Sequence, residues 1–479
     1  MRRVSEQLIG IGVLIAATVA AAPPAVGAPV VTVDAFEDTF DGSCTDRDCS
    51  LRDAVAAVDP GGTVRVPAGF YPLSLAGAGG IESGDLDLVR PVTIVGTGET
   101  GSFLDASALG DRVFDVGANV ELRHLTLLGG SEVGRGGVIR ATVGTFELRR
   151  STVSGGRADD GGAVAVGSGA TVSIDRSWIF ENRATGRGGG LFLLGTTVIS
   201  RSTISGNHAV GGGGAFVGPS ASLTIGNATV SRNVAVRGGG VRAFGDIVLF
   251  FASVVANHAG VGGGVLLSSA SESSTANTVF ARNDASDRGP LCVRPLSSEG
   301  RNVADVRGCG LTAPDDVAGV APLVGILRQN GGPTPTHALK ADSPAVGRGS
   351  GCHPTDQRGA PRSDCDSGAY ELVLCLGRPV TIVGTPGSDD LSGGLERDVF
   401  LGLGGNDEFQ GSLDVDRACG GRGDYRLIGG PGGYLLAGDR GRDVLLGEGG
   451  DDMLFGGRGA DTCRGGDGRD VTRRCETVS

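Results

Sequence analysis

Between residues 136 and 283, apolar and polar positions repeat six times in the same order. Each copy has a run of glycines, an apolar pair, two more apolar positions, a small residue, a β-branched residue and then, in most copies, an asparagine. The residues that follow the glycine runs recur every 24 to 28 positions: Val138, Ala163, Leu191, Ala215, Val241 and Val265. A second apolar column keeps steps of 24 to 26: Val153, Ile179, Ile204, Val230, Val254 and Val279. A third column consists of Asn182, Asn207, Asn233, Asn257 and Asn283. A period of roughly 20–50 residues indicates a repeat architecture, and short β-branched runs between glycines predict strands.

We expect each repeat to form one coil of a parallel β-helix. A coil of two or three short strands cannot bury its own apolar face, so neighbouring coils must stack to make a continuous core. In such a stack, with roughly 4.8 Å between coils, the asparagine side chains can hydrogen-bond to one another along the rod. Leu127 lies 26 residues before Val153, so at least one coil precedes the six clear ones.

A second pattern, with a period of nine residues, runs through ten units from Gly384 to Arg473. Every unit begins with glycine, and its eighth position is mostly apolar. The sixth position is an aspartate in eight units: Asp389, Asp398, Asp407, Asp416, Asp443, Asp452, Asp461 and Asp470. Tyr425 and Tyr434 take this position in the two middle units. Residues 384–473 hold 17 acidic residues and 10 arginines, a net charge of −7, against −12 for the whole chain. A glycine turn exposes backbone carbonyls and the carboxylate adds charge, which is what a hard cation such as Ca²⁺ requires.

This segment resembles the hemolysin-type, or RTX, calcium-binding repeat, G-G-x-G-x-D-x-U-x. Gly456-Gly-Arg-Gly-Ala-Asp461 and Gly465-Gly-Asp-Gly-Arg-Asp470 match its first six positions. The resemblance implies a small parallel β-roll in which two units make one turn, so that units n and n+2 share an ion. The eight aspartates are then the expected calcium ligands, paired Asp389 with Asp407, Asp398 with Asp416, Asp443 with Asp461, and Asp452 with Asp470. The two tyrosines should split the ions into two clusters, and the first should be weaker because Glu396 and Asp414 replace the fourth glycine.

The N-terminus predicts export and a cap for the β-helix. Arg2 and Arg3 precede an apolar run over residues 8–22, which is typical of a signal peptide, here residues 1–28, with cleavage after residue 22, 27 or 28 left open. Ser50-Leu-Arg-Asp53 predicts a capping box on a short helix ending near Val58. Cys49-Ser-Leu-Arg-Asp-Ala-Val55, with residues 66–71 and 84–88, resembles the CSLREA domain of secreted bacterial β-helix proteins, with Asp53 where the motif has Glu. We expect this cap over residues 29–91 and coils over 92–290.

A further segment, residues 291–373, is expected to be the C-terminal cap of the β-helix. Its strings Asp356-Gln-Arg-Gly359 and Cys365-Asp-Ser-Gly-Ala-Tyr-Glu371 resemble the "choice-of-anchor" segment that follows such β-helices. Asp356 and Arg358 are interpreted as a structural ion pair rather than a catalytic one. Residues 374–479 are then the calcium-binding β-roll. The predicted fold class is therefore all-β, with a right-handed parallel β-helix, as the resemblance to the pectin-lyase-like proteins implies, followed by the smaller roll.

The cysteines and the charge limit the environment of the protein. All ten cysteines lie beyond the signal peptide, and an even number in an exported chain predicts disulfides. Proximity pairs 44 with 49, 292 with 309, 352 with 365 and 463 with 475, which leaves Cys375 and Cys419 to each other. The acidic balance argues against a nucleic-acid partner and an anionic membrane surface. After signal removal we expect no transmembrane segment, with calcium and an extracellular polysaccharide or cell-surface component as partners.

Two functions remain open for this sequence. The main prediction is a secreted structural or adhesive protein, because the acidic residues of the coils do not gather on one face and no nucleophile or zinc motif is present. The alternative is a carbohydrate-active enzyme, a polysaccharide lyase or hydrolase, since the pectin-lyase-like fold also supports such chemistry. Arg150, Arg176 and Arg201 should stack at one corner of adjacent coils, where they either meet an acidic polysaccharide or pair with acids such as Asp175.

Overall fold

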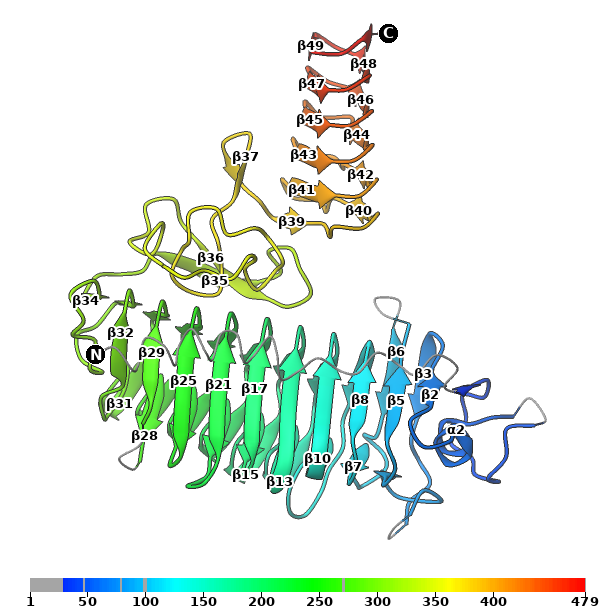
Figure 1. Cartoon of the computed structure of the whole chain (residues 1–479), viewed down its shortest axis with the longest axis vertical. Coiled ribbons are helices and arrows are strands. Elements are labelled where there is room, and N and C mark those ends of the chain that lie inside the picture. The colour runs from blue at the N-terminus through cyan, green and yellow to red at the C-terminus, as the bar shows by residue number, and fades with distance from the viewer. Residues whose placement is uncertain (1–28, 46–47, 78–79, 98–100, 269–271, 479) are drawn as a thin grey trace.

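The computed structural model describes residues 29–45, 48–77, 80–97, 101–268 and 272–478. The expected signal peptide, residues 1–28, lies outside them. A long rod of stacked coils carries a second, smaller stack, which rises from its side and is stacked in a different direction (Figure 1). Among the described residues, no helix is long and apolar enough to cross a membrane.

Three parallel sheets run along the rod and confirm the parallel β-helix. Sheet A holds β1 (Val30–Thr32), β2 (Thr63–Arg65), β4 (Leu86–Leu88), β5 (Val92–Val95), β7 (Phe114–Val116), β8 (Val120–Arg123), β10 (Ile139–Arg149), β13 (Val164–Asp175), β16 (Leu191–Leu193), β17 (Thr196–Ser200), β20 (Ala215–Val217), β21 (Ser222–Gly226), β24 (Val241–Ala243), β25 (Asp246–Phe250), β28 (Val265–Leu267), β29 (Ser274–Ala276) and β32 (Ser297–Gly300). Sheet B holds β3 (Gly69–Pro72), β6 (Ser102–Asp105), β9 (Leu125–Leu128), β11 (Thr152–Ser154), β14 (Trp178–Phe180), β18 (Thr203–Ser205), β22 (Thr229–Ser231), β26 (Ser253–Val255), β30 (Val279–Ala281), β33 (Val303–Ala304) and β34 (Val317–Ala318). Sheet C holds β12 (Arg157–Asp160), β15 (Arg183–Arg187), β19 (His208–Gly211), β23 (Val234–Arg237), β27 (His258–Val261) and β31 (Asp284–Arg288).

The strand register follows the predicted columns, with one-residue corrections at three positions. In sheet A the paired column is Ile139, Val164, Leu191, Ala215, Val241 and Val265, so the expected Val138 and Ala163 each stand one residue early. These two follow shorter glycine runs, and the N–H of Ala163 bonds to the carbonyl of Gly190, so Ala163 takes the place of a third glycine. In sheet B, Val254 pairs with Phe280 rather than Val279, which places the phenyl ring in the coil core.

The predicted asparagine ladder is present at the corner between sheets B and C. The Nδ2 group of each asparagine donates to Oδ1 of the next, from Asn182 to Asn207, Asn233, Asn257 and Asn283, at 2.9 to 3.0 Å. Each Oδ1 also accepts the backbone N–H of the asparagine one coil earlier. The four amides from Asn182 to Asn257 are fully buried, so the ladder satisfies backbone groups that water cannot reach.

The N-terminal segment begins as the sequence predicts. Helix α2 (Leu51–Ala57) has the capping box in which the Ser50 side chain accepts from Asp53 N–H and the Asp53 side chain accepts from Ser50 N–H. It lies at the end of the rod where β1 and β2 pair (Figure 1). Because β2 pairs with β5, and β33 and β34 extend sheet B, strand pairing continues on both sides of residues 92–290.

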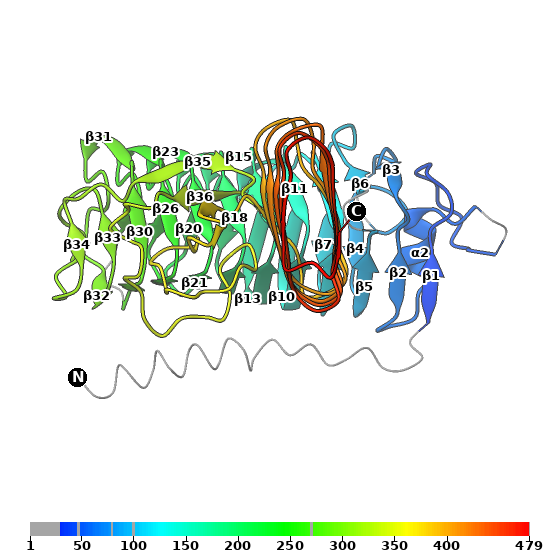
Figure 2. The ribbon, with the colours of Figure 1, turned by 90° about the horizontal axis from the view of Figure 1, so that it is seen from above.

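The segment after the coils packs against the outer face of sheet B. It contains the antiparallel pair β35 (Val324–Arg328) and β36 (Thr336–Leu339), which lies beside the coils in both views (Figures 1 and 2). Gln357 Nε2 donates to Thr203 Oγ1 at 2.8 Å, and the ring of His337 bonds to Ser231. This segment therefore covers several coils from the side.

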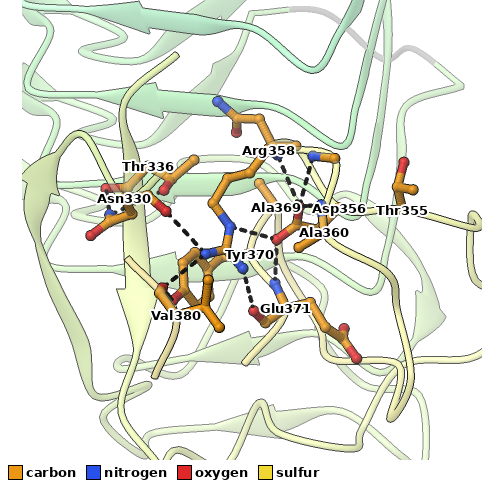
Figure 3. Close-up of polar contacts among 12 residues, drawn as sticks. Asn330, Thr336, Thr355, Asp356, Arg358, Ala360, Ala369, Tyr370, Glu371 and Val380 are labelled. Carbon is orange, nitrogen blue, oxygen red and sulfur yellow. Dashed lines mark hydrogen bonds and ion pairs between the residues drawn. The ribbon is translucent and has the colours of Figure 1, made fainter. Parts of the chain in front are cut away.

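A buried ion pair organises that segment, as the sequence predicts for Asp356 and Arg358. The Arg358 guanidinium donates to Asp356 Oδ2 at 2.8 Å and to the carbonyls of Asn330, Glu371 and Val380, and its plane lies 3.8 Å from the ring centre of Tyr370 (Figure 3). Both ionic side chains are fully buried. Because the donors of the Arg358 guanidinium are satisfied by Asp356 and by carbonyls of three separate loops, the ion pair holds these loops together.

The second stack is a parallel β-roll with two units per turn. After the hairpin of β37 (Leu374–Cys375) and β38 (Arg378–Pro379), one sheet holds β39 (Ile382–Val383), β41 (Val399–Gly404), β43 (Arg417–Arg422), β45 (Leu435–Arg440), β47 (Met453–Arg458) and β49 (Val471–Arg473). The facing sheet holds β40 (Asp390–Ser392), β42 (Glu408–Gln410), β44 (Arg426–Gly430), β46 (Val444–Gly449), β48 (Thr462–Asp467) and β50 (Thr477–Val478). From Val399 to Val471 the pairing advances by 18 residues per turn, and the turns superimpose as a flattened ring (Figure 2). Eighth-position side chains such as Phe400, Phe409 and Leu445 fill its core.

All ten cysteines form disulfides: the four pairs that proximity predicts and one between the two remaining cysteines. The pairs are Cys44–Cys49, Cys292–Cys309, Cys352–Cys365, Cys375–Cys419 and Cys463–Cys475. The fourth joins the hairpin that enters the roll to the roll itself.

Candidate metal centre

The sixth-position side chains form two ladders, one along each edge of the roll. In each rung, the backbone N–H of one sixth-position residue donates to Oδ1 of the aspartate one turn later. On the first edge the rungs join Asp389 to Asp407, Tyr425 to Asp443, and Asp443 to Asp461, at 2.9 to 3.0 Å. On the second edge they join Asp398 to Asp416, Tyr434 to Asp452, and Asp452 to Asp470, at 2.8 to 3.1 Å. The structure therefore brings the eight expected aspartates together in the four expected pairs.

Glycine makes these turns possible at the fourth position of the unit. Gly441 and Gly459 have φ of 138° and 145°, in the region that only glycine adopts readily. A Cβ on Gly459 would stand 1.5 Å from the carbonyl oxygen of Gly441 one turn earlier. Close stacking of the turns thus requires glycine here.

Four of the aspartates have a buried oxygen without a partner. Within the described residues, Oδ2 of Asp407, Asp443, Asp452 and Asp461 has no hydrogen-bond partner. The exposed fraction is 2% for Asp407 and 0% for the other three residues. Leaving a buried polar atom unpaired costs about 1–3 kcal/mol, and more for a charged group. A cation beside these oxygens would remove that cost.

The electrostatics of the ladder also favour a bound cation. Burial, followed by the neighbouring carboxylates, raises the pKa of Asp443 and of Asp452 to about 6. Burial also raises the pKa of Asp407 to about 6. Each of these groups is thus destabilised in its charged form, which is the form that binds Ca²⁺.

The remaining aspartates of the first cluster already have hydrogen-bond donors. Oδ2 of Asp389, Asp398 and Asp416 accepts the backbone N–H of Thr385, Gly394 and Ser412, respectively, each from the start of its own unit. Because these oxygens are already hydrogen-bonded, a cation would stabilise them less than the unpaired oxygens of Asp443, Asp452 and Asp461. The contrast supports the expectation that the first cluster binds more weakly.

The two tyrosines separate the clusters. The side chains of Tyr425 and Tyr434 are buried in the roll, and a Cβ on Gly402 or Gly411 would stand 2.6 or 2.7 Å from their rings. The Tyr434 hydroxyl donates to the carbonyl of Ser412. Each ring therefore occupies the space beside the glycine turn where the neighbouring turns carry a carboxylate.

Sequence reasoning missed one member of the first ladder, Glu476. Asp461 N–H donates to Glu476 Oε2 at 2.6 Å, so the first ladder continues past the last nonapeptide. Glu476 lies 15 residues after Asp461, so it does not fit the 18-residue spacing by which the other members of the ladder can be recognised.

The acidic residues of the coils do gather in part, contrary to expectation. Arg149 forms ion pairs with Glu121 at 3.6 Å and with Glu147 at 2.6 Å, because β8 and β10 bring these residues into register. Asp175 binds Arg176 at 3.0 Å and Arg201 at 2.8 Å.

The arginine column also lies where the sequence predicts. Arg150, Arg176 and Arg201 occupy the same corner of adjacent coils, each with φ between 45° and 48°. Arg176 and Arg201 pair with Asp175. This matches the alternative in which the arginines pair with acidic residues of the chain rather than with a polysaccharide. A groove of about 730 Å³ lies beside this corner, lined by Arg123, His124, Arg150, Arg176 and Pro333, among others.

Comparison with known proteins identifies the repeats of the roll. A family model described as the RTX calcium-binding nonapeptide repeat matches residues 383–418, 392–427 and 437–471. The chain therefore carries calcium-binding RTX repeats. No curated protein matches the chain significantly.

Two solved structures resemble the chain weakly. The crystal structure of pectate lyase Pel9A matches over 72% of this chain and 97% of that chain, with 14% sequence identity and a TM-score of 0.40. The structure of PL6 family alginate lyase AlyGC matches over 94% of this chain and 74% of that chain, with 10% identity and a TM-score of 0.28. The β-helix is established by the strand pairing of the chain itself.

Proposed function

We propose that this chain is a secreted protein with a structural or adhesive role, made rigid at its C-terminal end by calcium. The ions lie between successive turns of the roll, bound by Asp389, Asp398, Asp407, Asp416, Asp443, Asp452, Asp461 and Asp470. Backbone carbonyls of the glycine turns complete the six to eight oxygens that Ca²⁺ prefers. The second cluster binds more tightly than the first.

The observation that carries this proposal is the set of buried, unpartnered oxygens on Asp407, Asp443, Asp452 and Asp461. Carboxylates stacked one turn apart repel one another unless a cation lies between them. Folding and calcium binding are therefore linked, and the roll orders where free calcium is high. The outside of a cell is such a place, and five disulfides also persist there.

The partner of such a surface is an extracellular polysaccharide or another cell-surface component. In support, Arg422, Arg440 and Arg458 stand in register on successive turns of the roll. Together with Arg474 they line a shallow groove of about 550 Å³. Arginine forks suit carboxylate groups, so an acidic glycan fits this row.

Calcium titration of the metal-free chain tests the proposal. We expect calorimetry to detect several bound ions and near-ultraviolet circular dichroism to report ordering of Tyr425 and Tyr434. Trp178, the single tryptophan, lies in the coils and should not respond. If millimolar calcium produces neither heat nor a spectral change, the calcium-dependent role is wrong.

A second candidate function is cleavage of an acidic polysaccharide. The observation in its favour is a groove of about 310 Å³ between sheet A and the segment after the coils. Arg149, Asp175, Arg201 and His353 are among the side chains that line it. Release of unsaturated or reducing ends from polyuronates, abolished in Arg149→Ala, would establish the enzyme; the structural role predicts no release by the purified chain.

A further inference from the structure

The first ladder of the roll ends on a residue that does not belong to any nonapeptide. Glu476 Oε2 accepts the backbone N–H of Asp461 at 2.6 Å. One turn earlier, Asp461 Oδ1 accepts the N–H of Asp443 in the same way at 3.0 Å. The carboxylate of Glu476 therefore stands where the sixth-position aspartate of a further turn would stand.

The chain reaches this position by a shortened final turn. The backbone N–H of Glu476 donates to the carbonyl of Asp461 at 3.1 Å, and β50 pairs with β48 through Thr462 and Thr477. The adjacent Cys475 is bonded to Cys463, whose side chain is fully buried in the core of the roll. The disulfide thus fixes the residue next to Glu476 to the turn that carries Asp461.

The two carboxylates are placed as the ligand pairs of the roll are placed. Asp461 is fully buried, and its Oδ2 has no hydrogen-bond partner among the described residues. A second carboxylate beside it would raise the electrostatic cost unless a cation lay between them. Because Thr477 pairs with Thr462, Glu476 stands in register with Asp461, although 15 residues separate them instead of the 18 of a full turn.

We propose that Asp461 and Glu476 form a terminal calcium site that closes the open end of the roll. The inference rests on calcium binding by the preceding turns, and it adds one ion that the nonapeptide pattern does not predict. A bound ion here would hold the last turn on the stack, since an end rung has a neighbour on one side only.

The test counts the ions bound by the full-length chain at neutral pH, by native mass spectrometry and calorimetry. Glu476→Gln removes the charge of the terminal carboxylate and keeps its shape, so we expect it to bind one ion fewer than the unsubstituted chain. Glu408→Gln is the matched control, because Glu408 is an exposed acid of the same roll, paired with Arg426. It should bind the full number.

A second variant tests the placement of Glu476 rather than its charge. Cys463→Ser combined with Cys475→Ser keeps Glu476 but releases the segment next to it, and we expect a weaker affinity for one ion only. An unchanged number and affinity in Glu476→Gln would overturn the terminal site while leaving the other ions in place. If the unsubstituted chain bound no calcium, the proposed function itself would fail, which is a different result.

Discussion

Asp443 and Asp461 lie one turn apart on the same edge of the roll, joined by a hydrogen bond of 3.0 Å from the N–H of the first to Oδ1 of the second. The other carboxylate oxygen of both residues is buried and has no partner among the described residues. One oxygen thus holds the turns together and the other remains for a cation. This division of roles explains how one residue type serves both the fold and the metal.

The first prediction concerns this pair. Asp443→Asn should retain the ladder hydrogen bond through its amide oxygen but lose the charge, and so weaken calcium binding in the second cluster at least tenfold. The measurement is calorimetric titration of the full-length chain. Asp390→Asn removes an exposed acid of the same roll as the control. Equal affinities for the two variants would contradict the assignment of Asp443 as a ligand.

Substitution of the two tyrosines should increase calcium binding instead of weakening it. Replacing both Tyr425 and Tyr434 by aspartate restores an uninterrupted ladder on each edge, so the number of bound calcium ions should rise. Without calcium the same variant should be less stable than the parent, because it loses two buried rings and gains two buried charges. Native mass spectrometry gives the count. Substitution of both residues by phenylalanine should leave it unchanged, and a count that does not rise in the aspartate variant would contradict the interpretation of the tyrosines as spacers.

The raised pKa values predict how the metal-free roll responds to pH. The pKa of Asp443 and Asp452 is about 6 in the folded roll and ~3.9 in an unfolded chain. The folded state therefore binds protons more tightly, and its stability falls as the pH rises from about 4 through about 6. In EDTA, the roll should melt at a higher temperature at pH 5 than at pH 7.5, as followed by tyrosine circular dichroism.

Calcium should reverse this pH dependence of the melting temperature, because protons compete with the ion for the same carboxylates. In calcium, the roll should therefore melt at a higher temperature at pH 7.5 than at pH 5. The same pH order in both buffers would show that these groups do not bind the ion.

The asparagine ladder should contribute to the stability of the coils but not to that of the roll. Asn233→Ala leaves the buried N–H of Asn207 without an acceptor, at a cost of about 1–3 kcal/mol for each group left unpaired. Trp178 fluorescence during denaturant unfolding measures the loss, since this residue lies in the same coils. Val210→Ala, at a half-exposed position, should change stability by only about 0.5 kcal/mol. The calcium affinity should not change in either variant.

Much of this architecture could be predicted because the period of the coils and the period of the nonapeptides are both visible in the spacing of residues along the chain. The spacing of the asparagines predicts the ladder. The nine-residue period marks the repeating aspartates, and the resemblance to the RTX repeat implies the two edges of the roll and the pairing of those aspartates. Predictions fail where length varies locally. Ala163 replaces a glycine and shifts the column by one residue, and Glu476 reaches its place through a shortened turn.

Other features depend on packing that no period encodes. The segment with Arg358 lies against sheet B because Gln357 and His337 find partners on the strands there. The gathering of Glu121, Glu147 and Arg149 follows from the register of β8 and β10. Which aspartate oxygens are left unpartnered depends on a single N–H at the start of each unit, such as that of Ser412 beside Asp416.

The most direct test of the account is a crystal structure of the full-length chain grown in calcium, with anomalous diffraction used to locate the ions. We predict calcium peaks between Asp443 and Asp461 and between Asp452 and Asp470, each touching the carboxylate oxygens that take no part in the ladder hydrogen bonds, and no peak beside the rings of Tyr425 and Tyr434. Peaks confined to the outer surface, or stacked aspartates without any ion between them, would contradict the claim that calcium holds the turns of the roll together.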